Sequence, residues 1–352
     1  MIAGCSCLFS FASLAAAHCT LQLRSIGSYS VPAETYVDSY RFGGISGLDY
    51  DGRTGQWYLV SDDRKEYQAA RIFAAELKFD SQRVIDVALH SGRLVDDAAA
   101  TDAEGIRVDP QRRELLLAGE GDADRRIGPW LRRTDFSGHV LEQIRLPPLF
   151  EPDFRSERRG PRPNESIEGI AFDSQGGGLW IALEAPLRQD GPAASVDRGA
   201  DVRLTLRDAA GKSIGQHVYS IDAARAHAPG ESSDSGISEI LASNDHELLV
   251  LERSGTRAVD GSFRFHTRLY CADTTDATDV AALDSLVSQS YVKVAKRLLY
   301  DFDSLRGLTV DNLEGMSWGP ALSGAQRSLV FVSDNNMVKG LATQFIVFAA
   351  SP

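Results

Sequence analysis

The sequence predicts an all-β protein, a β-propeller, on three observations. A short segment of the form Glu-Gly-Ile recurs along the chain with small variations. Each copy is followed by a run of β-forming residues that ends in an acidic residue. Helical periodicity is weak throughout, and residues 276–289 are the best short candidate for a helix. Since four-stranded sheets repeated around an axis are the architecture of a propeller, we expect that fold.

Five units carry the repeat, and each begins with two β-rich runs separated by turn residues such as Asp51-Gly52. The first runs are Ile45–Tyr50, Asp102–Asp109, Ser166–Asp173, Ile237–Ala242 and Asn312–Trp318. The second runs are Trp57–Asp63, Leu115–Glu120, Leu179–Glu184, Leu248–Glu252 and Leu329–Asp334. The two repeated positions are 16 residues apart in three units (46 to 62, 104 to 120, 168 to 184), 13 in the fourth (239 to 252) and 20 in the fifth (314 to 334). Equal offsets in three units indicate a true repeat.

The spacing of the units predicts the number of blades. The second acidic positions (62, 120, 184, 252 and 334) recur at intervals of 58, 64, 68 and 82 residues. Common propeller repeats have about 40 to 50 residues, so the last interval has room for one more degenerate unit, near Phe263–Cys271. Five visible units and one hidden unit suggest six blades, with a first strand near Thr20–Ile26 completing a blade beside Gln344–Phe348. A β-sandwich is the alternative fold, but it does not explain the equal offsets.

Composition and charge limit the class of protein. The chain has 352 residues, of which 43% are hydrophobic and 24% charged, as in soluble globular proteins. The formal net charge is −12, from 37 Lys and Arg against 49 Asp and Glu. An acidic surface repels phosphate backbones, so we expect no nucleic-acid partner. Acidic residues that converge on one point would instead bind cations.

The amino terminus predicts export. Residues 7–17 form an apolar run that ends in Ala15-Ala16-Ala17, which is typical of a signal peptide over residues 1–17, followed by one domain over 18–352. The run is too short to span a bilayer, so we expect no membrane span and a periplasmic or extracellular protein. No Lys or Arg precedes the run, which leaves a buried first strand as the alternative.

Cleavage after residue 17 would leave two cysteines, Cys19 and Cys271. They could form a disulfide in an oxidising compartment, but we expect two unpaired buried thiols. Neither belongs to a C-x-x-C motif, which excludes zinc-ribbon and thioredoxin-like sites.

The repeated acids predict a cation site. If the units are blades, Glu104, Glu168, Glu239 and Glu314 converge on the axis, and the acids that end the second strands form another ring. Crowded carboxylates need compensating cations, either calcium or the arginines that follow two of these acids, Arg64 and Arg253. The alternative is that the acids only bond to backbone groups at strand ends. The candidate metal ligands are Asp62, Asp63, Glu104, Glu120, Glu168, Glu239, Glu252, Glu314 and Asp334.

At these positions the chain resembles the phytase-like family described by the label "esterase-like activity of phytase". The resemblance runs in order from about residue 40 to the end. It includes the stretches Gly43–Asp49, Leu59–Arg64, Asp102–Ile106, Asn164–Ile170, Leu251–Ser254, Asp311–Gly315 and Val332–Asn336. The resemblance implies an exported β-propeller, loosely related to the calcium-dependent propeller phytases.

The leading interpretation is therefore an exported, calcium-dependent phosphoric ester hydrolase that acts on a small phosphorylated or ester substrate as a monomer. Arg64 and Arg253 would hold phosphate oxygens, and Glu168 or Glu184 would accept a proton. A non-catalytic propeller that binds calcium or a partner is one alternative. A metal-dependent lactonase or carboxylic esterase is another. The sequence has no G-x-S-x-G serine motif and no H-E-x-x-H zinc motif.

Overall fold

The computed structural model describes residues 19–62, 70–97, 99–155, 158–226 and 228–352. The proposed signal peptide, Asp63 and Arg64 lie outside the described residues. Within them, no helix is both long enough and apolar enough to cross a membrane.

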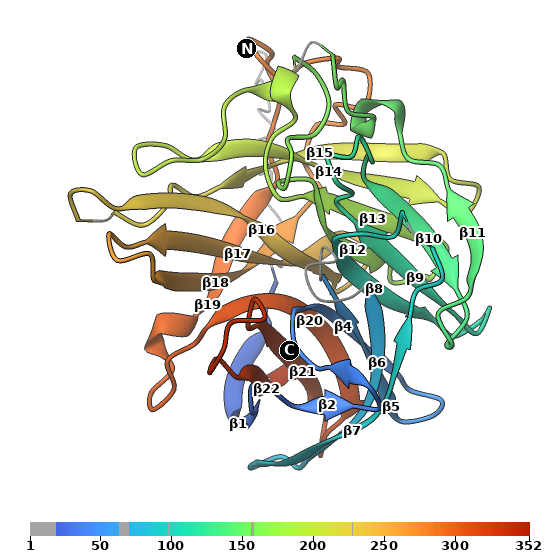
Figure 1. The fold of residues 1–352 in the computed structure, drawn as a ribbon. Coiled ribbons are helices and arrows are strands. Elements are labelled where there is room, and N and C mark those ends of the chain that lie inside the picture. The colour runs from blue at the N-terminus through green and yellow to red at the C-terminus, as the bar shows by residue number, and fades with distance from the viewer. Residues whose placement is uncertain (1–18, 63–69, 98, 156–157, 227) are drawn as a thin grey trace, which may run out of the picture.

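Five four-stranded antiparallel sheets are arranged around one axis (Figure 1). Blade 1 has β4 (Ile45–Asp51), β5 (Gln56–Ser61), β6 (Arg71–Phe79) and β7 (Val84–Leu94). Blade 2 has β8 (Ala103–Asp109), β9 (Glu114–Gly119), β10 (Trp130–Thr134) and β11 (Val140–Ile144). Blade 3 has β12 (Ile167–Phe172), β13 (Gly178–Leu183), β14 (Ala200–Asp208) and β15 (Ser213–Ile221). Blade 4 has β16 (Ser232–Ala242), β17 (Glu247–Arg257), β18 (Phe263–Asp273) and β19 (Ala295–Asp301).

Blade 5 combines the two ends of the chain. It has β20 (Asn312–Ala321), β21 (Arg327–Asp334) and β22 (Thr343–Ser351), and its outermost strand is β1 (Gln22–Val31). β1 pairs with β22 from Gln22↔Ser351 to Val31↔Thr343, so the expected closure of the ring by the first and last strands is confirmed. The remaining elements are the hairpin β2 (Tyr36–Val37) and β3 (Tyr40–Arg41), and the short 3-10 turns η1 (Pro148–Phe150), η2 (Arg188–Asp190) and η3 (Phe302–Ser304).

The propeller fold is confirmed, but the expectation of six blades is wrong. The segment assigned to a hidden unit, Phe263–Cys271, belongs to β18, the third strand of blade 4. The long last interval is instead taken up by an irregular segment, residues 274–294, between β18 and β19. Length alone could not distinguish an extra blade from a long connection.

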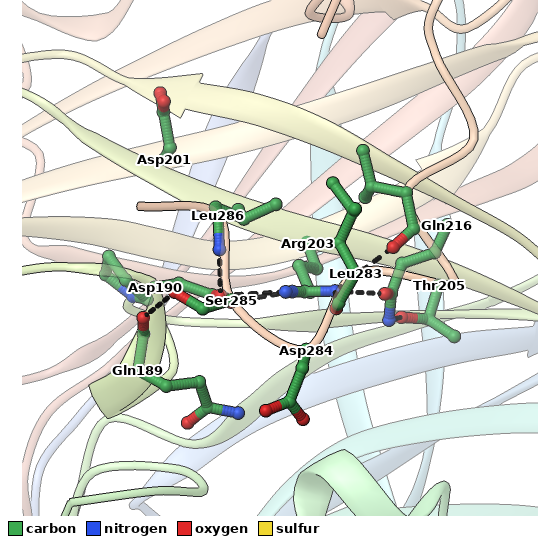
Figure 2. A network of polar contacts seen from close by, with 12 residues as sticks. Gln189, Asp190, Asp201, Arg203, Thr205, Gln216, Leu283, Asp284, Ser285 and Leu286 are labelled. Atoms are coloured by element: carbon green, nitrogen blue, oxygen red, sulfur yellow. Dashed lines mark hydrogen bonds and ion pairs between the residues drawn. The ribbon is translucent and has the colours of Figure 1, made fainter. Parts of the chain in front are cut away.

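This connecting segment is anchored on the outer part of blade 3 by a buried polar network (Figure 2). The guanidinium of Arg203 in β14 donates to both carboxylate oxygens of Asp190, at 2.6 and 2.7 Å, and to the carbonyl of Leu283, at 2.9 Å. The backbone N–H of Leu286 donates to Asp190 at 2.9 Å. Because these buried groups bond to one another, a segment without regular structure keeps a defined position.

The hydrophobic core lies between the blades. Separate apolar clusters fill the junctions of blades 1 and 2, 2 and 3, 3 and 4, 4 and 5, and 5 and 1. The innermost strands are β4, β8, β12, β16 and β20, and each contacts the next around the axis. Since apolar side chains are buried between the sheets, polar side chains occupy the axis.

A β-bulge in each innermost strand explains the Glu-Gly-Ile repeat. The register shifts at Ser46, Glu104, Glu168, Ser238 and Glu314. Bulges re-aim the side chain of the extra residue. The glycine that follows allows close approach of the next blade: a Cβ at Gly105 would lie 2.8 Å from Ile170, and a Cβ at Gly169 would lie 2.7 Å from the backbone of Ile240.

Cys19 and Cys271 form a disulfide, so the expectation of two unpaired thiols is wrong. The bond joins the residue close before β1 to β18, and thus the start of the described chain to blade 4. Sequence spacing could not show this pairing, because closure of the ring brings together cysteines that are 252 residues apart.

Candidate functional site

The bulge positions form the first level of the site. Three of the five carry Glu104, Glu168 and Glu314, whose exposed fractions are only 5 to 7%. The other two carry Ser46 and Ser238, which are also buried. The predicted convergence of the repeated glutamates therefore holds for three residues.

The second level is formed by the residue that follows each second strand or ends it. The backbone N–H groups of Asp62, Glu120 and Glu184 donate to the carbonyls of Gly44, Asp102 and Ser166, at 2.8, 2.9 and 2.7 Å. In blade 5 the equivalent residue is Asp334, which pairs with Asn312. In blade 4 it is Arg253, which pairs with Gly236. This level thus contains four acids and one arginine.

Two predicted ligands lie elsewhere. Glu239 follows the bulge of blade 4 and occupies the place that glycine has in the other blades, and Glu252 precedes the ring position. The sequence pattern aligned Ile-Ser-Glu of blade 4 with Asp-Ala-Glu of blade 2, whereas the structure aligns it with Ala-Glu-Gly, so both glutamates were placed one residue out of register. A slip of one residue in a strand turns a side chain to the opposite face, so neither belongs to the ring.

Both displaced glutamates have partners of their own. Glu239 forms an ion pair with Arg107 of β8 at 2.8 Å, and the same guanidinium donates to the carbonyls of Leu48 and Ile240. Glu252 accepts hydrogen bonds from the Tyr219 hydroxyl at 2.5 Å and from Lys296 at 2.7 Å. Their roles are those of buried, locally compensated charges.

The remaining acids form two overlapping groups whose geometry suits a metal ion. Carboxylate oxygens of Asp62, Asp102 and Glu104 lie within 4.8 Å of one another, and so do those of Glu104, Glu120 and Glu168. Glu104 belongs to both groups. Asp102 was not among the predicted ligands, although it lies in the repeat two residues before Glu104. Its backbone has a positive φ of 55°, and it is buried at the start of the innermost strand of blade 2.

The electrostatics of these acids follow from burial and crowding. Burial raises the pKa of Glu104 well above its usual value, and the nearby charges of Glu168 and Asp102 raise it further. Burial and the charges of Glu184 and Glu120 do the same to the pKa of Glu168. Burial also raises the pKa of Asp334 well above the usual range, and the charge of Glu314 adds to this effect.

Arg253 compensates negative charge in the part of the ring formed by blades 3, 4 and 5. Its guanidinium bonds to Glu184 at 2.6 Å, and to Glu314 and Asn312 at 2.9 Å each. Burial nevertheless raises the pKa of Glu184 to about 7. The predicted compensation by arginine is therefore present, in the half of the ring formed by blades 3, 4 and 5.

Glu104 and Glu168 have no such partner. Neither carboxylate forms a hydrogen bond or ion pair with a residue that the structure describes, although both residues are more than nine-tenths buried. Hard carboxylate oxygens in this number are the ligands that calcium prefers. The residues present therefore fit a calcium ion, which would supply a positive charge beside these carboxylates.

Two cavities open at the ring. One, of about 450 Å³, is lined by Asp102 and Glu120 of the metal groups and by the side chains of Arg126, Arg162 and Arg188. The other, of about 1260 Å³, reaches Glu184 and Arg253. A small molecule in the smaller cavity would lie beside acids of the metal groups, and one in the larger cavity would lie beside Glu184 and Arg253.

No curated protein matches the sequence. Among solved structures, the catalytic domain of the GH62 α-L-arabinofuranosidase of Coprinopsis cinerea is 10% identical, with 93% of this chain and 98% of that chain covered and a TM-score of 0.46. A chain of the nidogen/laminin complex is 10% identical, with coverages of 90% and 93% and a TM-score of 0.37. At these identities and TM-scores, the similarities say nothing about activity.

The family comparison is more specific. The model of the phytase-like family, described as "esterase-like activity of phytase", matches residues 40–337, which include all five innermost strands and every acid of the two metal groups. The chain belongs to the phytase-like family.

Proposed function

We propose that this protein is an exported, calcium-dependent hydrolase of small phosphoric esters, acting as a monomer at the mouth of the propeller channel. The observation that carries the proposal is the pair of three-carboxylate groups that share Glu104. Membership of a family described as esterase-like supports hydrolysis of an ester bond. The disulfide supports export, since such bonds persist mainly in oxidising compartments.

Five residues would hold the metal: Asp62, Asp102, Glu104, Glu120 and Glu168. Calcium, when bound, would neutralise the negative charge of a phosphate ester and polarise it towards attack by water. Asp63 and Arg64 stay predictions from the sequence, as a further ligand and a phosphate-binding side chain.

Glu184 is the candidate proton acceptor. It lies outside both metal groups, and a carboxyl with a pKa of about 7 can take up a proton from water near neutral pH. Its bond to Arg253 fixes its orientation. Arg253 also lines the larger cavity, so the same side chain is placed to contact an anionic substrate.

The test combines metal content with activity. We expect purified protein to contain calcium and to release phosphate from p-nitrophenyl phosphate, and chelation to abolish the release until calcium is restored. Glu184→Gln should lower kcat by 10²-fold or more while calcium still binds, as for loss of a general base. Glu231→Gln, at a carboxylate beside blade 4 that pairs with Arg264, is the control and should keep full activity.

The alternatives give different results. Calcium binding without turnover of any ester would identify a non-catalytic calcium-binding propeller. Turnover of a lactone or carboxylic ester without phosphate release would identify a metal-dependent lactonase or carboxylic esterase. Protein that neither contains nor binds calcium would overturn the proposal.

A further inference from the structure

Blade 4 extends past the ring. β16, β17 and β18 have 11 residues each, whereas the two inner strands of blades 2 and 3 have 6 or 7. Arg253 marks the level of the ring in β17, and pairing with β18 continues beyond it as far as Arg257↔Phe263. Because a strand advances about 3.3 Å per residue, these four further residues raise the edge of blade 4 by about 13 Å above the ring.

This extension carries an aromatic shelf, formed by Phe263 and Phe265. The two rings stack with centroids 6.0 Å apart and planes inclined by 8°. Gly255 lies opposite Phe265 in β17, so the residue paired with Phe265 has no side chain. Phe263 is 57% exposed, although large apolar side chains are normally buried. The guanidinium of Arg253 lies 6.0 Å from the centroid of Phe265 and joins the shelf to the ring.

One cavity connects the aromatic shelf with Glu184 and Arg253 of the ring. The space of about 1260 Å³ is lined by Phe263 and Phe265 together with Glu184 and Arg253. Further apolar lining comes from Leu308, Val310, Val338 and Leu341. A molecule that fills this cavity therefore meets apolar walls and a polar, charged end.

The charges of the cavity limit what it can take. Its acidic lining residues are Glu165, Glu184, Asp234, Asp303 and Asp311, and its lysine and arginine residues are Arg253, Arg264 and Lys339. Acids outnumber the permanent cations, so a ligand with many negative charges would be repelled. A ligand with one acidic group, directed at Arg253, is compatible with this lining.

We propose that the aromatic shelf binds the organic group of the substrate, and that the substrate is an ester of a flat, apolar or aromatic alcohol carrying a single phosphate rather than a polyphosphorylated molecule. The inference rests on the proposed function, because it takes the reacting ester to lie at the ring. The ring of the alcohol stacks on Phe265, and the single phosphate lies beside Arg253 and Glu184. Specificity thus comes from blade 4, whereas the metal ligands come from blades 1, 2 and 3.

Equilibrium binding tests the shelf without turnover. In the presence of calcium, phenylphosphonate should bind the full chain about tenfold more tightly than methylphosphonate, because only the former places a ring on the shelf. Inositol hexakisphosphate should bind more weakly than phenylphosphonate. The double variant Phe263→Ala/Phe265→Ala should lose the preference for the phenyl compound. Tyr36→Ala, which removes an exposed ring of the β2–β3 hairpin, should keep it.

A second pair of ligands separates the shelf from the phosphate. In one outcome, phosphonates fail to bind while benzoate binds better than acetate, and the double variant loses this preference. That result would support the aromatic shelf as a binding site and would contradict the proposal that the substrate is a phosphoric ester. Equal affinities for the phenyl and methyl compounds in both pairs overturn the shelf, even if phosphate is released from p-nitrophenyl phosphate. The proposal is also overturned if the double variant keeps the wild-type Tm and still prefers the phenyl compound. Tighter binding of inositol hexakisphosphate than of phenylphosphonate would overturn it as well.

Discussion

Two sets of buried carboxylates lie around the axis, and they differ in how their charge is balanced. Glu239 forms an ion pair with Arg107 at 2.8 Å. Arg253 forms ion pairs with Glu184 at 2.6 Å and with Glu314 at 2.9 Å. Glu104 and Glu168 have no ion pair with any described residue. A carboxylate buried without a counter-ion has to take up a proton or a cation. The difference separates acids that an arginine contacts from acids that have no ion pair among the described residues, although burial still raises the pKa of Glu239 to about 8 and that of Glu184 to about 7.

The largest expected effect on stability concerns the buried ion pair of Arg107 and Glu239. Arg107→Met leaves Glu239 buried without its cation, and removal of one partner of a buried ion pair costs about 3–5 kcal/mol. Because burial raises the pKa of Glu239 to about 8, we expect the free energy of unfolding to fall by this amount at pH 9, measured by denaturant titration. The stabilisation by calcium should stay unchanged, because Arg107 lies outside the metal groups. A loss below about 1 kcal/mol would show that Glu239 is neutral in the native protein.

The next effect concerns Glu104 and Glu168, which have no ion pair with a described residue. Calcium at a hundredfold above its Kd should stabilise the wild type by about 2.7 kcal/mol. Glu104→Gln and Glu168→Gln each remove an anionic ligand, so calcium affinity should fall by more than tenfold, or about 1.4 kcal/mol, in titration calorimetry. Glu252→Gln is the control, since the structure places this predicted ligand against Tyr219 and Lys296. Undiminished calcium affinity in both ring variants would remove these glutamates from the site.

The smallest effect is a pH dependence of the calcium-free protein. A raised pKa in the folded state means that the native protein holds protons that the unfolded chain has lost. Stability is therefore full below the unfolded value of about 4.5 for Glu, and is lost as the pH rises towards the folded values. Since Glu184 titrates at about 7 and the pKa values of Glu104 and Glu168 are raised well above 4.5, Tm in a chelator should fall between pH 5 and 8.

Two comparisons check this interpretation. Glu168→Gln should melt above the wild type in chelator at pH 8, because it relieves repulsion among Glu168, Glu184 and Glu120. Calcium should reduce the fall of Tm with pH, because the metal takes the place of the protons. A Tm that rises from pH 5 to 8 in chelator would contradict the raised pKa values.

The sequence by itself determined much of the architecture. The recurrence of Glu-Gly-Ile and of the acids at the strand ends predicts the propeller, because a repeated unit has to occupy equivalent places around an axis. The pairing of the first and last strands follows from the need to remove exposed sheet edges. Glu104, Glu168 and Glu314 could be assigned to one ring from their equal positions in the repeat.

Tertiary structure alone decided the number of blades, the register in blade 4 and the disulfide. An inserted connection and a further blade have the same length, and only the packing of residues 274–294 on blade 3 distinguishes them. The bulge in β16 lies at Ser238, so Arg253 rather than Glu252 reaches the ring. The sequence of blade 4 has no Glu-Gly pair to mark that position. A bulge shifts every following side chain by one place, and its location depends on contacts with neighbouring blades that no local pattern records.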